Sequence, residues 1–165
     1  MAGDVSFDVV SDFDHQELVN ALDQVRREVA ARFDFRNITV QLDLGKDEIA
    51  LRTSDEYRAK AVRELIESKA VRRGLSLKIF DWGAIEPAGK DTVRQRIGLR
   101  RGLDEDLAKK IAKLVRDEFP KVRPQIQGDS VRVSGKSKDE LQKVIARLRQ
   151  TADEYPVAIQ FENYR

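Results

Sequence analysis

Arginine alternates with apolar residues in one stretch of this 165-residue chain, Thr92-Val-Arg-Gln-Arg-Ile-Gly-Leu-Arg-Arg101. Successive side chains of a β-strand point to opposite faces, so the pattern predicts a strand that buries Val93, Ile97 and Leu99. Its outward side chains are those of Arg94, Arg96 and Arg100. A guanidinium group binds a phosphate or a guanine edge through two parallel N–H groups. The chemistry to expect is therefore the binding of a negatively charged ligand.

A second polar set belongs to a predicted hairpin around Gly128 and Asp129, formed by residues 125–127 and 130–134. Alternation buries Ile126, Val131 and Val133 and turns Arg132 outward between glutamines, whose amides can read bases. If residues 92–99 lie beside residues 130–134, three arginines converge on one open face. The predicted nucleotide-binding residues are Arg94, Arg96, Arg100, Gln125, Gln127, Arg132 and Gln160. The alternatives are a face covered by surface salt bridges or one packed against the other half.

The elements that must position these side chains occur in the same order twice: strand, helix, two strands, helix, strand. In the first half the strands are expected at residues 5–10, 38–44, 48–52 and 75–79, with helices after Asp14 and Thr53. Such duplication fixes an architecture. We predict an α+β fold, a tandem of two ferredoxin-like (RNP-like) βαββαβ sandwiches. Each has a four-stranded antiparallel sheet with two helices on one face.

The expected domain boundaries follow from this repeat. They are an N-terminal domain 1–83, a linker 84–91 rich in glycine and proline, and a C-terminal domain 92–165. In a sheet of order 4-1-3-2, Pro124 and Pro156 fall on edge strands, where a missing N–H donor is tolerated. The local pattern leaves open whether the two halves exchange their first strands.

Charge is divided unevenly between the halves. Residues 1–83 carry 13 Lys and Arg against 16 Asp and Glu, and residues 84–165 carry 18 against 13. The second half therefore favours an anionic partner. The outward residues of the first half are mixed in sign and are expected to support folding or to line a cleft. They are Asp8, Thr39, Gln41, Asp43, Arg52 and Lys78.

Enzymatic motifs are absent from the sequence. Without cysteine the chain has no disulfide, thiolate metal site or Cys nucleophile, and its one histidine, His15, is expected at a helix start. Residues 83–92 fail the P-loop pattern, which needs four residues between its glycines and Ser or Thr after Lys. We expect a non-enzymatic protein without metal or cofactor. The absence of a long apolar run and of a leader favours a cytoplasmic location.

The layout also matches RNA-recognition domains, except that these stack bases on exposed aromatic rings of their central strands. Here the corresponding positions hold Arg, Ser and Gln. RNA binding would depend on arginine stacking and phosphate contacts instead.

Several segments closely resemble the bacterial YajQ family. They are Ser6-Phe-Asp-Val-Val-Ser11, Arg32-Phe-Asp-Phe35, Gln125-Ile-Gln-Gly-Asp-Ser-Val-Arg-Val-Ser-Gly135, Asp139-Glu-Leu-Gln142 and Gln160-Phe-Glu-Asn-Tyr-Arg165. The resemblance covers nearly the whole chain, with departures at Pro124 and Tyr164. It implies tandem ferredoxin-like, RNP-like domains and a cytosolic protein that binds nucleotides, with links to RNA and cyclic di-GMP. It supplies no catalytic residues.

Two functions follow as hypotheses. The first is nucleotide or RNA binding through the Arg/Gln-rich open face of the second half. The second is a regulatory protein-interaction module that responds to cyclic di-GMP. The sequence leaves open the identity of the nucleotide, the protein partner and the oligomeric state.

Overall fold

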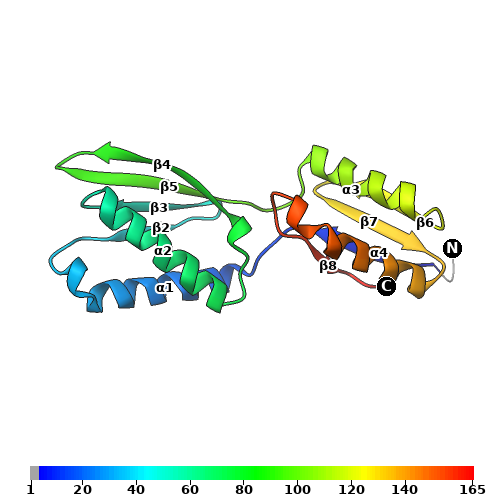
Figure 1. Ribbon diagram of the computed structural model, residues 1–165, viewed down its shortest axis with the longest axis horizontal. Helices are drawn as coiled ribbons and strands as arrows, with labels where there is room; N and C mark the ends of the chain where they lie inside the picture. The colour runs from blue at the N-terminus through cyan, green and yellow to red at the C-terminus, as the bar shows by residue number, and fades with distance from the viewer. Residues whose placement is uncertain (1–3) are drawn as a thin grey trace. The chain divides into compact units, whose positions relative to one another are not determined.

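The computed structural model describes residues 4–165, which form two compact units (Figure 1). We call the continuous segment Phe13–Arg100 the insertion unit. The composite unit consists of the described residues up to Asp12 together with Arg101–Arg165. The insertion unit is thus inserted between two segments of the chain that fold together.

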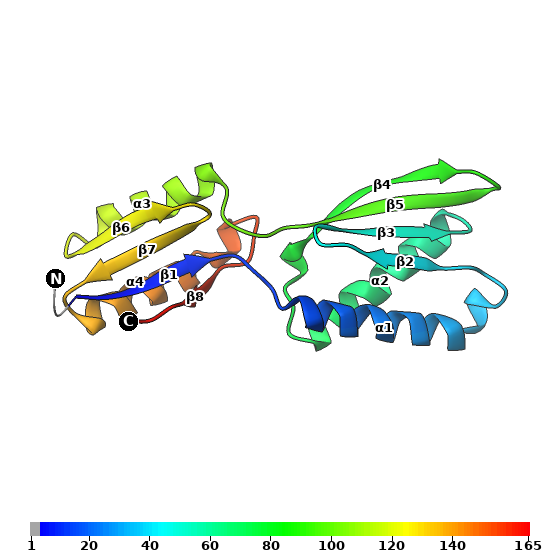
Figure 2. The same ribbon diagram turned by 180° about the vertical axis from the view of Figure 1, so that it is seen from behind.

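The composite unit is a four-stranded antiparallel sheet with two helices on one face (Figures 1 and 2). The strand order is β6-β7-β1-β8. Its core includes Phe7 and Val9 of the central strand β1, both fully buried beneath the helices. The elements are β1(Val5–Val10), α3(Glu105–Glu118), β6(Val122–Gln127), β7(Ser130–Gly135), α4(Lys138–Gln150), the 3-10 turn Ala152–Glu154 and β8(Gln160–Glu162).

The insertion unit has the same architecture, with strand order β2-β3-β5-β4 and helices α1 and α2 on one face (Figure 2). Its own hydrophobic core includes Leu22, Ile49, Ile66 and Ile97. The elements are α1(His15–Ala31), the 3-10 turn Phe33–Phe35, β2(Gln41–Leu44), β3(Glu48–Thr53), α2(Glu56–Arg72), the 3-10 turn Leu77–Ile79, β4(Phe80–Ala88) and β5(Thr92–Leu99).

Local signals place most helix boundaries. Asp14 caps α1 by accepting hydrogen bonds from the backbone N–H groups of Gln16 and Glu17, and Ser137 caps α4 in the same way. Gly74, at φ +77°, follows the end of α2, a conformation that residues with a Cβ rarely adopt. The α+β class and the two antiparallel four-stranded sheets expected from the repeat are confirmed.

The domain boundaries differ from those expected. Residues 84–91 are not a linker, because β4 runs through residue 88 and pairs with β5 across a turn at residues 89–91. The expected strand at 75–79 is wrong as well, since it contains a 3-10 turn and the strand begins at Phe80. Glycine and proline made residues 84–91 resemble a linker. An edge strand such as β4 nevertheless tolerates Pro87, and Gly83 lies in a β-bulge of the same strand.

The two halves also exchange their first strands. β1 lies between β7 and β8 of the composite sheet, in the position that residues 92–99 were expected to fill. β5 lies between β3 and β4 of the insertion sheet. Consequently, 1–83 and 92–165 are not the folding units, because each lacks a central strand that the other contains.

Candidate functional site

The exchange of strands divides the predicted binding residues between the two units. Arg94 and Arg96 lie on β5 of the insertion sheet, whereas Arg132 lies on β7 of the composite sheet. The expected convergence of these three arginines on one sheet is therefore wrong. β1, and not β5, is the neighbour of β7.

On the open face of the insertion sheet, polar side chains cross all four strands in one row. Arg52 of β3 lies opposite Arg94 of β5, with Gln41 of β2 and Glu86 of β4 at either end. Arg52 has no ion-pair partner within residues 4–165. Sequence reasoning assigned Arg52 to a set of mixed charge in the other half. Its pairing with β5 makes it a third arginine on this face.

Beside this row the face is hollowed. The cavity has a volume of about 480 Å³. Its floor is formed by small residues, Ala50, Gly83 and Ala84, and its charged rim holds Arg94 and Arg96. The complete lining is Glu48, Ala50, Leu51, Gly83, Ala84, Glu86, Arg94, Gln95 and Arg96. A hollow of this size with a few charged groups has the dimensions of a small-molecule site.

A β-bulge forms one wall of this hollow. The register of β4 against β5 shifts between Trp82 and Ile85, so Gly83 and Ala84 lie outside the regular pairing. The buried Gln95 fills the bulge from the other side and donates a hydrogen bond from Nε2 to the Gly83 carbonyl oxygen, at 2.8 Å. Its Oε1 is buried without a hydrogen-bond partner.

The backbones of β4 and β5 come so close at Gly83 that only glycine fits there, since a Cβ would lie 2.6 Å from the carbonyl oxygen of Arg96. We expect Gly83→Ala to lower the free energy of unfolding by roughly 2 kcal/mol, because the backbone of β4 must shift. The fluorescence of Trp82, the only tryptophan, follows unfolding of this unit in urea. Gly89→Ala is the control, because no atom beyond its two chain neighbours lies within 4 Å of that Cβ position. Equal stabilities of the two variants would contradict the argument.

The arginines at the rim are weakly engaged. Nε of Arg94 lies 3.3 Å from the Glu86 carboxylate, and Arg96 contacts Glu48. The Arg94 and Arg96 side chains are 62% and 76% exposed. Ion pairs so open to water contribute little to stability. Both guanidinium groups can therefore exchange a carboxylate for an anionic ligand at small cost.

Arg100 differs from its neighbours on β5. Its Nη1 donates to the carbonyl oxygens of Lys78 at 3.3 Å and Phe80 at 3.5 Å, and its Nη2 lies 3.5 Å from Asp81. These contacts hold the start of β4 against the end of β5. The Arg100 guanidinium group is therefore already bound to backbone carbonyl oxygens of the same unit, unlike those of Arg94 and Arg96.

On the composite sheet, Arg132 is held by a buried carboxylate. Its Nε lies 2.9 Å from Oδ1 of Asp8, and its Nη2 lies 3.3 Å from Oδ2, which also accepts from Asn163 at 2.9 Å. The hydrogen bond from Arg132 lowers the pKa of Asp8, against the effect of burial, and raises the pKa of Arg132. Asp8 is part of β1, and it lies directly opposite Arg132 because β1 pairs with β7 in the composite sheet.

The predicted glutamines lie on the same composite face. Gln125 is directly opposite Arg132 across β6 and β7, and Gln127 is exposed two residues further along. Gln160 of β8 already has a structural contact, because its Oε1 accepts a 2.8 Å hydrogen bond from the backbone N–H of Asp12. This face therefore offers two exposed amides beside one fixed guanidinium group.

Within residues 4–165 no group of His, Cys, Asp or Glu has an arrangement that would hold a metal ion. Over the same residues, none of the helices combines the length and apolar character needed to cross a membrane.

Comparison with known proteins finds similarity along the whole chain. A family model described as nucleotide-binding protein YajQ-like matches residues 5–165. A protein of Chloroflexus aggregans is 56% identical over 165 residues, and one of Trichodesmium erythraeum is 52% identical. A third relative, from Roseiflexus castenholzii, is 50% identical. The similarity covers 100% of this chain and of each relative, and each relative is named a nucleotide-binding protein.

Proposed function

Because this chain belongs to the family of YajQ-like nucleotide-binding proteins, we propose that it binds a nucleotide, without catalysis, in the hollow of the insertion sheet. The observation that carries the proposal is the placement of Arg94 and Arg96 at the rim of that hollow, exposed and held only by weak ion pairs. The phosphates bind to these two guanidinium groups, whose forked N–H groups match phosphate oxygens.

The small residues of the floor accommodate the base. Ala50, Gly83 and Ala84 let a flat ring approach the backbone closely. The bulge places Gly83 and Ala84 outside the regular ladder. Because the Gly83 carbonyl oxygen already accepts from Gln95, the backbone of Ala84 is the part of the bulge that would bond a base edge. Arg52 and Gln41, in the row beside the hollow, are the contacts for a longer ligand.

The choice among ligands follows from this geometry. A mononucleotide or a cyclic dinucleotide fits a hollow of about 480 Å³. An RNA strand would extend along the row of Gln41, Arg52 and Arg94. On the composite sheet, Gln125, Gln127 and Arg132 form a second polar face for RNA. The absence of cysteine fits action in the cytoplasm, a reducing compartment.

The test is calorimetric titration of the full chain with GTP, ATP, cyclic di-GMP and a short single-stranded RNA at two salt concentrations. We expect Arg94→Gln/Arg96→Gln to weaken nucleotide binding by at least about tenfold, because two charge-assisted hydrogen bonds to phosphate are lost. RNA binding should decrease more steeply with salt than that of a mononucleotide, because RNA makes more phosphate contacts.

The matched control is Lys109→Gln/Lys113→Gln, which removes two exposed cations from α3 of the composite unit. It should leave the affinity within about twofold, since its only lost interactions are exposed ion pairs. Unchanged affinity of the Arg94/Arg96 variant would exclude this face as the site. Binding of cyclic di-GMP alone, with a protein captured only in its presence, would favour the regulatory module.

A further inference from the structure

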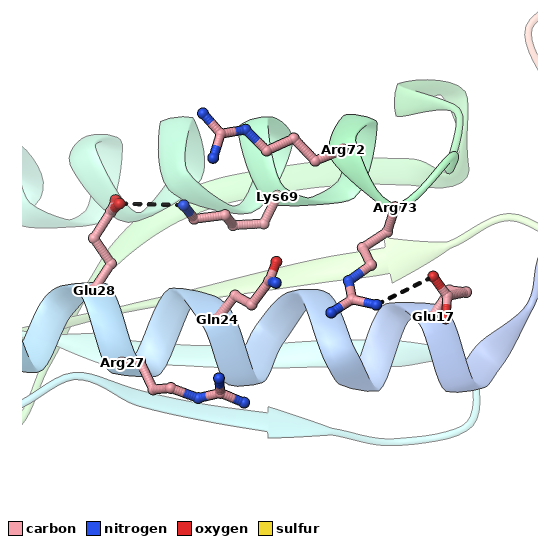
Figure 3. Close-up of a pocket in the computed structure, with 7 residues that line it drawn as sticks. All are labelled: Glu17, Gln24, Arg27, Glu28, Lys69, Arg72 and Arg73. Atoms are coloured by element: carbon pink, nitrogen blue, oxygen red, sulfur yellow. Dashed lines mark hydrogen bonds and ion pairs between the residues drawn. The ribbon is translucent and has the colours of Figure 1, made fainter.

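A second cationic site lies on the opposite side of the insertion unit, between α1 and α2. The two helices run antiparallel on the face of the sheet that is turned away from the hollow (Figures 1 and 2). A groove of about 640 Å³ separates their outer surfaces. Its lining residues are Glu17, Gln24, Arg27, Glu28, Lys69, Arg72 and Arg73 (Figure 3).

Two of the four cations in the groove are tethered to its two carboxylates. Lys69 Nζ lies 3.1 Å from the Glu28 carboxylate, and its side chain is only 12% exposed, so its ammonium group is well fixed. Arg73 Nη1 lies 3.7 Å from the Glu17 carboxylate, which also accepts from Asn20 at 3.1 Å. Both ion pairs bridge α1 to α2 or to the residue that follows it. These ion pairs therefore fix the spacing of the two helices along the groove and also fix the positions of Lys69 and Arg73.

The other two cations have no carboxylate of their own. Arg27 and Arg72 form no ion pair within the described part of the chain, residues 4–165. Figure 3 shows Arg27 on the α1 side of the groove and Arg72 on the α2 side, with Gln24 and Lys69 between the helices. The lining thus carries a surplus of two positive charges.

The helix dipole accounts for only part of this charge. Lys69 and Arg72 lie in the last turn of α2, where cations are favoured by the partial negative charge of the helix end. Arg27 lies before the last turn of α1 and has no such partner. Arg27 lines the groove together with three other cations, and Figure 3 shows its side chain along the side of α1 that is turned away from α2. Like charges in one lining repel each other unless an anion is bound.

We propose that this groove binds a di- or triphosphate group. Arg27, from α1, and Arg72, from α2, bind phosphate oxygens at the two sides of the groove. Between them, the Lys69 ammonium group provides a further positive charge and Gln24 donates an amide N–H. The planar guanidinium forks match phosphate oxygens better than isolated carboxylates. A phosphate chain also matches the surplus of two charges. The site is separate from the sheet-face hollow, and neither proposal depends on the other.

The experiment is a titration of the full chain with tripolyphosphate at low salt, carried out in the Arg94→Gln/Arg96→Gln background so that the hollow does not contribute. Calorimetry gives the affinity, and amide chemical shifts locate the site. We expect shifts at Gln24, Lys69 and Arg73. The further change Arg27→Gln/Arg72→Gln should weaken binding by roughly tenfold or more, as two charge-assisted hydrogen bonds disappear.

Two comparisons make the result specific. Arg36→Gln/Lys60→Gln removes two exposed cations of the same unit outside the groove and should change the affinity by less than about twofold. Glu28→Gln frees Lys69 from its carboxylate and should strengthen binding by roughly threefold. A purely structural role of the groove predicts no such gain.

The proposal is overturned if tripolyphosphate does not bind, if its shifts map elsewhere, or if the Arg36/Lys60 variant loses as much affinity as the Arg27/Arg72 variant. Citrate, an anion of similar charge, should bind more weakly, and equal affinity would overturn the assignment to phosphate. Far-ultraviolet circular dichroism confirms that each variant is folded. Because Arg27 and Arg72 are exposed, their replacement is expected to leave the fold intact.

Discussion

Residues 13–100, produced alone, are expected to fold with a cooperative thermal transition, whereas residues 92–165, produced alone, are expected to remain unfolded. The first fragment contains all four strands of the insertion sheet, both of its helices and its own core. The second lacks β1, the strand that lies between β7 and β8. It loses Phe7 and Val9, which are fully buried, at about 1.5–3 kcal/mol each.

The control restores the missing strand without the insertion unit. Joining Asp12 to Arg101 through a short Gly/Ser linker deletes residues 13–100 and retains every strand of the composite sheet. The two ends already meet, since the backbone N–H of Gly102 donates to the Ser11 carbonyl oxygen at 2.7 Å. We expect this shortened chain to fold. Circular dichroism and the dispersion of amide resonances show whether each of the three chains is folded. A folded 92–165 fragment would contradict the observed strand topology.

Replacement of Arg132 by Met should lower the melting temperature of the composite unit by several °C at pH 7, because a buried carboxylate loses its partly exposed cationic partner. The Asp8 carboxylate, 7% exposed, then keeps only the hydrogen bond from Asn163. Arg123→Met is the matched control on the neighbouring strand β6. Arg123 is 76% exposed in its pair with Asp4, so its loss should change the melting temperature little.

The pH dependence of the same pair has a defined sign. In the wild type, the hydrogen bond from Arg132 lowers the pKa of Asp8 below its ordinary value of 3.8. The stability that this group contributes is therefore complete above about pH 4 and is lost as the pH falls through the lower, folded-state pKa. In Arg132→Met the pKa of Asp8 should rise relative to the wild type, because burial is then opposed only by the hydrogen bond from Asn163 and the charge of Arg165. The loss in unfolding free energy should therefore be largest at neutral pH and shrink on acidification. Urea unfolding of both proteins between pH 3 and 7 measures this difference in unfolding free energy. A difference independent of pH would contradict a role for the Asp8 charge.

The local pattern of the sequence was sufficient for much of the candidate site. Alternation predicted that Arg94 and Arg96 leave the sheet on the face opposite Ile97, and the structure exposes both while burying Ile97. It could not find the hollow beside them. That cavity depends on Ala50 and on the bulge at Gly83, which come from other strands and meet β5 only in the folded sheet.

The groove between α1 and α2 shows the same division. The buried residues of α1 include Leu18, Leu22 and Val25, which recur at the three- to four-residue spacing of one helix face and can be read from the sequence. Arg27 and Arg72 lie on the outer edges of those helices and Lys69 lies between them, and sequence pattern carries no information about which residues of the other helix are near. Only the packing of α1 on α2 brings Arg27 within one groove with Lys69 and Arg72.

By itself, the sequence determined all four helices, most of the strands and the duplicated α+β architecture, but not β4, whose residues resemble a linker, nor the exposure of Ile126. Side-chain alternation, caps and turn residues act over a few neighbours, so they can be read without the fold. Only the tertiary structure decided which sheet each first strand joins. Both halves offer the same central position between their third and fourth strands, and residues 5–10 and 92–99 both bury apolar side chains on one face. Choosing between them depends on pairing across nearly the whole chain, as in the contact of Asp8 with Arg132.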